Sequence, residues 1–178
     1  LRMDDASGES PDASIEYVNA GFWQFDYLFP GLNANRPFSI VYTDALYEAL
    51  SVIADADKYP VLFHCTAGAD RTGTFAFLIS GLCGVSYEDL VKDFELTSFY
   101  SGRRWRSAIV NNDGVYSFTD SGVMLDDIND NLVSFGKMYN HIMTEYATSE
   151  GTLSSAIANY LYKVVNLSES EIHAIRAF

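Results

Sequence analysis

An apolar run, a loop that contains glycine and a helical pattern follow one another between residues 61 and 82. Val61-Leu62-Phe63 is apolar throughout, which is typical of a strand buried in a parallel sheet. A loop from His64 leads into a segment that is apolar on nearly every side from Thr72 to Leu82, as in a buried helix. This strand–loop–helix order constrains the fold more than any other part of the chain.

The rest of the pattern predicts an α/β fold with a helical C-terminal half. Residues 15–18 alternate as in a short strand, and several later segments carry apolar residues at helical spacing or begin with capping residues. The predicted helices cover residues 38–57, 72–83, 86–96, 125–146, 152–165 and the segment after Ser168. Because strands and helices alternate early, we expect a central, mostly parallel sheet flanked by helices.

Size and charge exclude several classes of protein. The chain has 178 residues, of which 48% are apolar, so we expect residues 1–178 to form a single globular domain. The net charge of -13 argues against a nucleic-acid groove and against general adsorption to anionic membranes. No apolar run approaches the ~20 residues of a membrane span. Arg103, Arg104 and Arg106 form a local basic cluster, interpreted either as a solvated loop or as a lid over a phosphate pocket.

Two cysteines, Cys65 and Cys83, do not make a disulfide framework. Cys83 stands late in an apolar helix, so we expect it in the core. A reducing compartment is consistent with cysteines that are not paired in disulfides, and no signal peptide is visible in the sequence. The expected location is therefore cytoplasmic, and a secreted effector is the alternative.

The loop has the composition of an oxyanion site. Cys65 and Arg71 stand six positions apart with Gly68 between them, and Gly68 permits a tight turn. Backbone N–H groups of the loop can converge on one point beside a helix N-terminus, and the Arg71 fork matches two phosphoryl oxygens. The expected phosphate-binding residues are Thr66, Ala67, Gly68, Ala69, Asp70, Arg71 and Thr72.

Cys65 is the candidate nucleophile. A helix N-terminus and a nearby arginine lower the pKa of a thiol from ~8.5 to roughly 3.5–7.5, so a thiolate would be present at neutral pH. Its attack on phosphorus gives a cysteinyl phosphate, which water hydrolyses. Thr72 is expected to donate a hydrogen bond to the sulfur in the second step, and His64 to orient the loop. No metal ion or other cofactor is required.

Protonation of the leaving group needs an acid. Asp70, inside the loop beside Arg71, is the first candidate for general acid and then for general base on water. The alternative, that Asp70 only holds Arg71 or a loop N–H in place, stays open. Asp44 and Asp26 are the reserve candidates.

The segment His64–Gly73 resembles the Cys-x5-Arg-[Ser/Thr] loop of the cysteine-dependent protein tyrosine phosphatase superfamily. More narrowly, it resembles the atypical bacterial tyrosine/serine phosphatases of the lipid-phosphatase-like branch. The likeness extends over residues 38–96 and 152–178. It implies a phosphomonoester hydrolase that acts on phosphotyrosine, and also on phosphoserine, of a phosphoprotein or a phosphorylated small molecule.

Two departures from this branch leave alternatives open. Ala69 stands where the branch usually has a lysine that would help to bind acidic substrates, and this departure argues against the second hypothesis, a phosphoinositide or inositol-phosphate phosphatase. Leu1-Arg2 is similar to the tail of a strand that ends in Asp-Leu-Arg, so the domain would lack an N-terminal strand segment and a fragment of its own fold would be a partner. A catalytically inactive phosphate-binding module is the third hypothesis.

Overall fold

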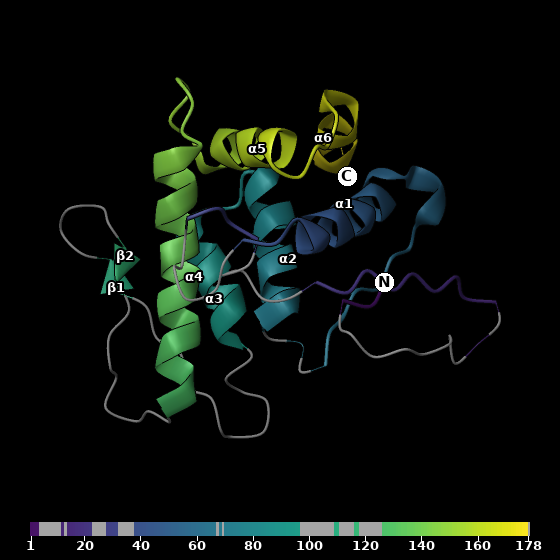
Figure 1. Ribbon diagram of the computed structural model, residues 1–178, viewed down its shortest axis with the longest axis horizontal. Coiled ribbons are helices and arrows are strands. Elements are labelled where there is room, and N and C mark those ends of the chain that lie inside the picture. The colour runs from purple at the N-terminus through teal and green to yellow at the C-terminus, as the bar shows by residue number, and fades with distance from the viewer. Residues whose placement is uncertain are drawn as a thin grey trace.

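The computed structural model describes residues 1–3, 12, 14–22, 28–31, 38–66, 68, 70–96, 109–110, 116–117 and 126–177. Helices dominate these residues (Figure 1). Their bounds are α1 Ile40–Ala54, the short 3-10 helix η2 Ala56–Lys58, α2 Asp70–Leu82, α3 Tyr87–Leu96, α4 Asp126–Glu145, α5 Leu153–Lys163 and α6 Glu169–Arg176. Two short strands, β1 Ile109–Val110 and β2 Tyr116–Ser117, pair antiparallel.

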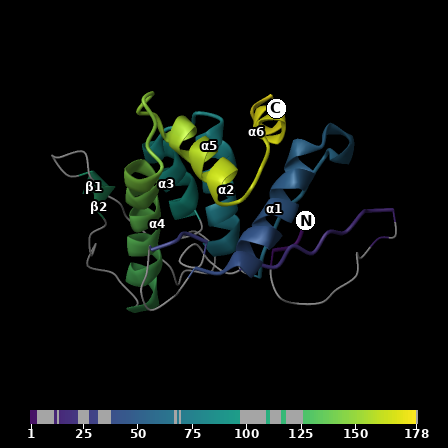
Figure 2. The same cartoon turned by 45° about the horizontal axis from the view of Figure 1, so that its top comes forward.

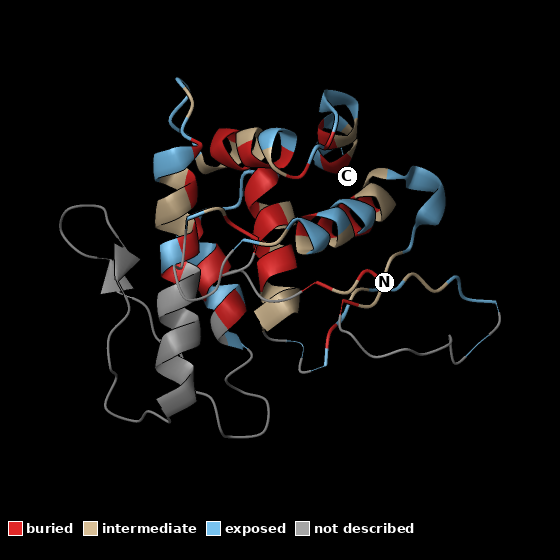
Figure 3. Cartoon of the chain, viewed as in Figure 1, coloured by how far each residue is buried: buried red, intermediate tan, exposed pale blue. Residues whose placement is uncertain are grey.

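Helix α2 lies at the centre and is covered by α3 and α5, while α1 packs against α6 and α4 packs against α5 (Figures 1 and 2). The buried residues of α2 are Thr74, Phe75, Phe77, Leu78, Gly81 and Leu82. Gly81 allows a close approach, because a Cβ there would lie 2.6 Å from Cδ1 of Ile157 on α5. The burial pattern follows this arrangement, with the buried residues of α2 and α5 facing each other across the core (Figure 3).

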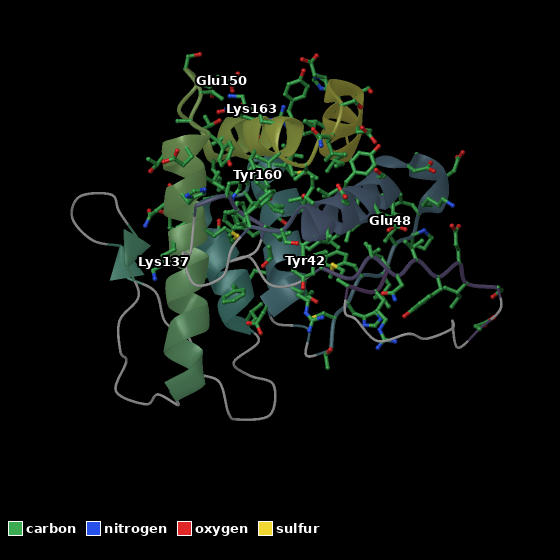
Figure 4. The ribbon with its side chains drawn as sticks, in the orientation of Figure 1. Tyr42, Glu48, Lys137, Glu150, Tyr160 and Lys163 are labelled. Atoms are coloured by element: carbon green, nitrogen blue, oxygen red, sulfur yellow. The ribbon has the colours of Figure 1, made fainter. Side chains whose placement is uncertain are left out.

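An aromatic cluster joins the C-terminal helices to the segment at residues 28–31. The Tyr160 side chain of α5 is fully buried, and its hydroxyl donates a hydrogen bond to the Leu28 carbonyl at 2.9 Å. The side chain of Tyr160 is labelled in Figure 4. Its ring centroid lies 4.6 Å from that of Phe29 and 5.2 Å from that of Tyr146. Burial raises the pKa of Tyr160 far above its ordinary value, so the phenol stays protonated and keeps this bond.

The helix predictions agree with the structure to within a few residues, and the two C-terminal caps are confirmed. The Thr152 side chain accepts a hydrogen bond from the Ser155 N–H, and Ser168 and Glu171 form a capping box. The start of α2 is one of these differences: α2 begins at Asp70, two residues before the expected Thr72. A carboxylate in the first turn favours this earlier start, because it faces the positive end of the helix dipole.

The expected central, mostly parallel sheet is wrong for the described residues. Parallel pairing there consists of isolated bridges from Arg2 to Asn19 and from Arg2 to His64. A central parallel strand must be paired along its length and covered on both faces. Leu62 is instead 79% exposed, and residues 61–63 form no ladder. A short apolar run does not by itself specify a buried strand, and this one leads directly into the loop.

Candidate active site

The loop between His64 and α2 begins at a short backbone network. The His64 N–H donates to the Leu1 carbonyl at 3.1 Å, and the Met3 N–H donates to the His64 carbonyl at 2.9 Å. Cys65 follows directly and is only 8% exposed. The entry to the loop is therefore fixed by the N-terminal residues, and the thiol lies at the edge of the core.

The middle of the loop faces solvent. Thr66 and Gly68 are exposed, and Gly68 has a φ of 66°, in the left-handed region that glycine adopts without strain. The backbone turns here as the sequence predicts. Ala67 and Ala69, two of the expected phosphate-binding residues, lie outside the described residues.

Arg71 lies in the first turn of α2 and is half-buried. Its Nη1 donates a hydrogen bond to the backbone carbonyl of Met3 at 3.3 Å. Thr72 follows, and its Oγ1 is buried without a hydrogen-bond partner among the described residues. The hydroxyl of Thr72 is therefore a buried donor that no described residue uses.

The candidate acids lie in different surroundings. Asp70 is half-buried at the start of α2, and its backbone carbonyl accepts a hydrogen bond from Thr74 Oγ1 at 2.8 Å. Asp44 is exposed on α1. Asp26 and the arginine cluster at residues 103–106 lie outside the described residues. Asp70 is thus the described candidate that belongs to the loop.

His64 and Cys83 complete the residues that the sequence singles out. Nδ1 of His64 lies 3.2 Å from the Cys65 carbonyl oxygen. Cys83 was expected in the core, but it is exposed, and its Sγ lies 3.7 Å from the Ile175 carbonyl oxygen. The expectation fails because Cys83 lies just beyond the last residue of α2, where the helix leaves the core.

Sequence reasoning missed Met3 as a partner of Arg71. The contact uses a backbone carbonyl, which every residue carries, so the identity of the side chain gives no signal. The described residues contain no group of three or more His, Cys, Asp and Glu side chains arranged to hold a metal ion. Among those same residues, no helix combines the length and the apolar character needed to cross a bilayer.

Comparison with known proteins identifies the family. Residues 31–178 match the tyrosine phosphatase family, and the chain belongs to it. A tyrosine-protein phosphatase of Nostoc commune is 48% identical over 48 residues, which is 27% of this chain and 16% of that protein. A putative tyrosine-protein phosphatase of Cupriavidus necator is 32% identical over 90 residues, 43% of this chain and 32% of that protein.

A third relative carries a different name. The inositol diphosphatase DSP1 of Oryza sativa subsp. japonica is 38% identical over 64 residues, 35% of this chain and 28% of that protein. The chain thus spans a third or less of the length of each of these relatives. No solved structure matches the chain.

Proposed function

We propose that this chain is the catalytic domain of a cysteine-dependent phosphomonoesterase that acts on phosphotyrosine, and also on phosphoserine. The observation that carries the proposal is the loop from Cys65 to Arg71, with its left-handed turn at Gly68 and its end in the first turn of α2, in a member of the tyrosine phosphatase family. Such a loop directs N–H groups, a helix dipole and a guanidinium at a phosphoryl group.

In the first step, Cys65 Sγ attacks phosphorus while the bond to the leaving oxygen breaks. Asp70 gives its proton to that oxygen, so the product leaves as a neutral phenol or alcohol. Arg71 and the loop N–H groups stabilise the charge that spreads over the equatorial phosphoryl oxygens. The cysteinyl phosphate is the product of this step.

In the second step, Asp70 takes a proton from water as the water attacks phosphorus, and the bond to Sγ breaks. The buried hydroxyl of Thr72, which has no partner among the described residues, donates a hydrogen bond to the departing thiolate. His64 supports the loop through its contact with the Cys65 carbonyl oxygen. A reducing compartment suits this chemistry, because oxidation of Cys65 would remove the nucleophile.

A phosphatase for inositol phosphates is a second candidate, and the name of the Oryza sativa relative favours it. Ala69 opposes it, since a lysine there would add a charge for a highly anionic ligand. Turnover of inositol polyphosphates and of phosphotyrosine peptides, compared at equal enzyme concentration, separates the two candidates.

The nucleophile is tested by turnover of a small aryl phosphate. Cys65→Ser is expected to abolish turnover, while Cys83→Ser, the matched control at the other end of α2, keeps the wild-type rate. Mass spectrometry of an acid-quenched reaction should find phosphate on Cys65. An active Cys65→Ser enzyme would overturn the mechanism, and phosphopeptide binding without turnover by the wild type would identify an inactive binding module instead.

The acid is tested by pH–rate profiles on substrates with good and poor leaving groups. Asp70→Asn is expected to remove the limb that reports the protonated acid and to slow alkyl phosphates more than activated aryl phosphates. Asp44→Asn, exposed on α1, is the control. If only Asp44→Asn changes that limb, Asp70 is not the acid.

A further inference from the structure

The backbone of Met3 connects the two ends of the loop. Its N–H donates to the carbonyl of His64, the residue before Cys65, at 2.9 Å. Its carbonyl accepts from Arg71 Nη1 at 3.3 Å. One residue from outside the loop is therefore hydrogen-bonded both to the residue that precedes the thiol and to the guanidinium at the loop's end.

Residues 1–3 are themselves held on both sides. The Arg2 N–H donates to the Val18 carbonyl at 2.8 Å, and the Ala20 N–H donates to the Arg2 carbonyl at 2.9 Å. On the other side, the N-terminal amine of Leu1 donates to the Leu62 carbonyl at 2.7 Å. The Met3 side chain is fully buried. The Met3 carbonyl is thus a fixed acceptor rather than part of a loose end.

Arginine uses a planar fork, and a bidentate contact with phosphate succeeds only when that plane is correctly oriented. A long side chain that must find this orientation at each turnover loses entropy on binding. A hydrogen bond from Nη1 to a fixed carbonyl removes much of that freedom beforehand. Of the five N–H donors of a guanidinium, this contact uses one.

We propose that Met3 is a positioning residue, whose backbone carbonyl orients the Arg71 guanidinium relative to the Cys65 thiol for contact with a phosphoryl group. The proposal rests on the proposed function, because it assigns Arg71 to phosphate. It adds that the geometry of the loop depends on residues more than sixty positions upstream, through a backbone group and not a side chain.

The experiment weakens the Met3 carbonyl as an acceptor and leaves the Met3 side chain unchanged; like any ester replacement, it also removes the N–H of the following residue. An amide-to-ester replacement of the bond between residues 3 and 4 makes the Met3 carbonyl a poorer acceptor. The matched control is an ester between residues 148 and 149, which weakens the Thr148 carbonyl, an acceptor from the Gly151 N–H at 3.0 Å in the turn before α5, and leaves every contact of residues 1–3 intact. Thermal unfolding of both full-length chains measures how much each replacement destabilises the fold.

Two measurements report how well the Arg71 guanidinium is positioned. The first is the rate at which phenylglyoxal modifies Arg71, measured by peptide mass spectrometry, with Arg176 as the internal reference because it is bonded to Leu82 and Ser154 instead. The second is the protection of Cys65 from iodoacetamide by inorganic phosphate. The ester after Met3 should speed modification of Arg71 and weaken phosphate protection, each by roughly three- to tenfold, and the control ester should change both less than about twofold.

The proposal is overturned if the ester after Met3 changes neither readout, or if the control ester changes both as much. If phosphate fails to protect Cys65 even in the wild type, the proposed function fails, and the rate at Arg71 still decides whether Met3 holds the guanidinium. A second pair of variants serves if an ester chain does not fold. Met3→Ala keeps the carbonyl but removes the buried side chain that holds it in place, so it should change both readouts, whereas Met138→Ala, also at a fully buried methionine, should change neither.

Discussion

Gly73 lies in the first turns of α2, two residues after Arg71, and faces a buried ring. A Cβ at this position would lie 2.5 Å from both Cδ2 and Cε2 of Phe94 on α3. Carbon atoms in contact are usually 3.5–4.0 Å apart, so Gly73→Ala forces α2 and α3 to separate. Phe94 is only 2% exposed, and the ring therefore has little room to move.

Two opposing effects set the magnitude. Alanine gains about 1 kcal/mol over glycine inside a helix, and overpacking a core costs typically 1–3 kcal/mol. We expect an overpacking cost in the upper part of the range of about 1–3 kcal/mol, because the new Cβ clashes with two ring atoms of Phe94. We expect Gly73→Ala to lower the free energy of unfolding by about 1–2 kcal/mol, a fall in Tm of roughly 2–4 °C for each kcal/mol.

Gly81→Ala is the matched control on the same helix. Its Cβ would meet the Ile157 Cδ1 methyl at 2.6 Å; this methyl is the end of a flexible side chain and shifts by one torsion, whereas the Phe94 ring must move as a unit. The gain in helix propensity should offset the smaller clash, leaving a net change of about zero. Because Gly81 lies at the other end of α2, its variant should keep the wild-type kcat/KM, whereas Gly73→Ala should lower kcat/KM about three- to tenfold by shifting Arg71.

The assay is urea unfolding followed by circular dichroism, with kcat/KM for an aryl phosphate measured on the same samples. Phe94→Leu in the Gly73→Ala background should restore part of both the stability and the activity, giving a coupling energy of about 1 kcal/mol in a double-mutant cycle. Strictly additive effects, or a Gly73→Ala chain more stable than the wild type, would refute the packing argument.

Two further predictions concern polar groups in the aromatic core. Burial lowers the pKa of His141 from its ordinary 6.5, against smaller raising effects from the Glu145 carboxylate and the Pro30 carbonyl. The unfolded chain then binds the proton more readily, so the free energy of unfolding decreases as pH falls below about 6.5 toward the pKa of the folded state. His141→Gln should reduce this decrease in urea titrations at several pH values. Identical pH dependence for the variant and the wild type would contradict the prediction. Tyr160→Phe should cost about 1–3 kcal/mol, because the Leu28 carbonyl loses a donor at 2.9 Å, whereas Tyr162→Phe, at a side chain 54% exposed, should change unfolding by less than about 0.5 kcal/mol.

Local chemistry predicts the helices and the turn at Gly68 well. The apolar residues of α2 repeat at helical spacing, and the caps at Thr152 and Ser168 contact residues three positions away. Because these signals lie close together in the sequence, the pattern alone identifies the helices. The tight turn at Gly68 is of the same kind.

The sheet and the Met3 contact depend on partners far along the chain. The run at residues 61–63 has the composition of a buried strand, yet whether it is paired is decided by which segments lie beside it. Arg71 is hydrogen-bonded to a carbonyl 68 positions away, and no side-chain pattern encodes that choice.

The positions of the two cysteines determine how the proposed phosphatase would respond to an oxidant. Cys65 precedes α2 and Cys83 follows it, and a helix of 13 residues is about 20 Å long. A disulfide needs Cα atoms about 4.4–6.8 Å apart, so Cys83 cannot act as a resolving thiol for an oxidised Cys65. A sulfenic acid formed at Cys65, the proposed nucleophile, would therefore be captured by an external thiol such as glutathione, condense with a backbone N–H to a sulfenamide with loss of water, or proceed to the irreversible sulfinic acid. Within this chain, recovery from peroxide depends on the surrounding thiol pool.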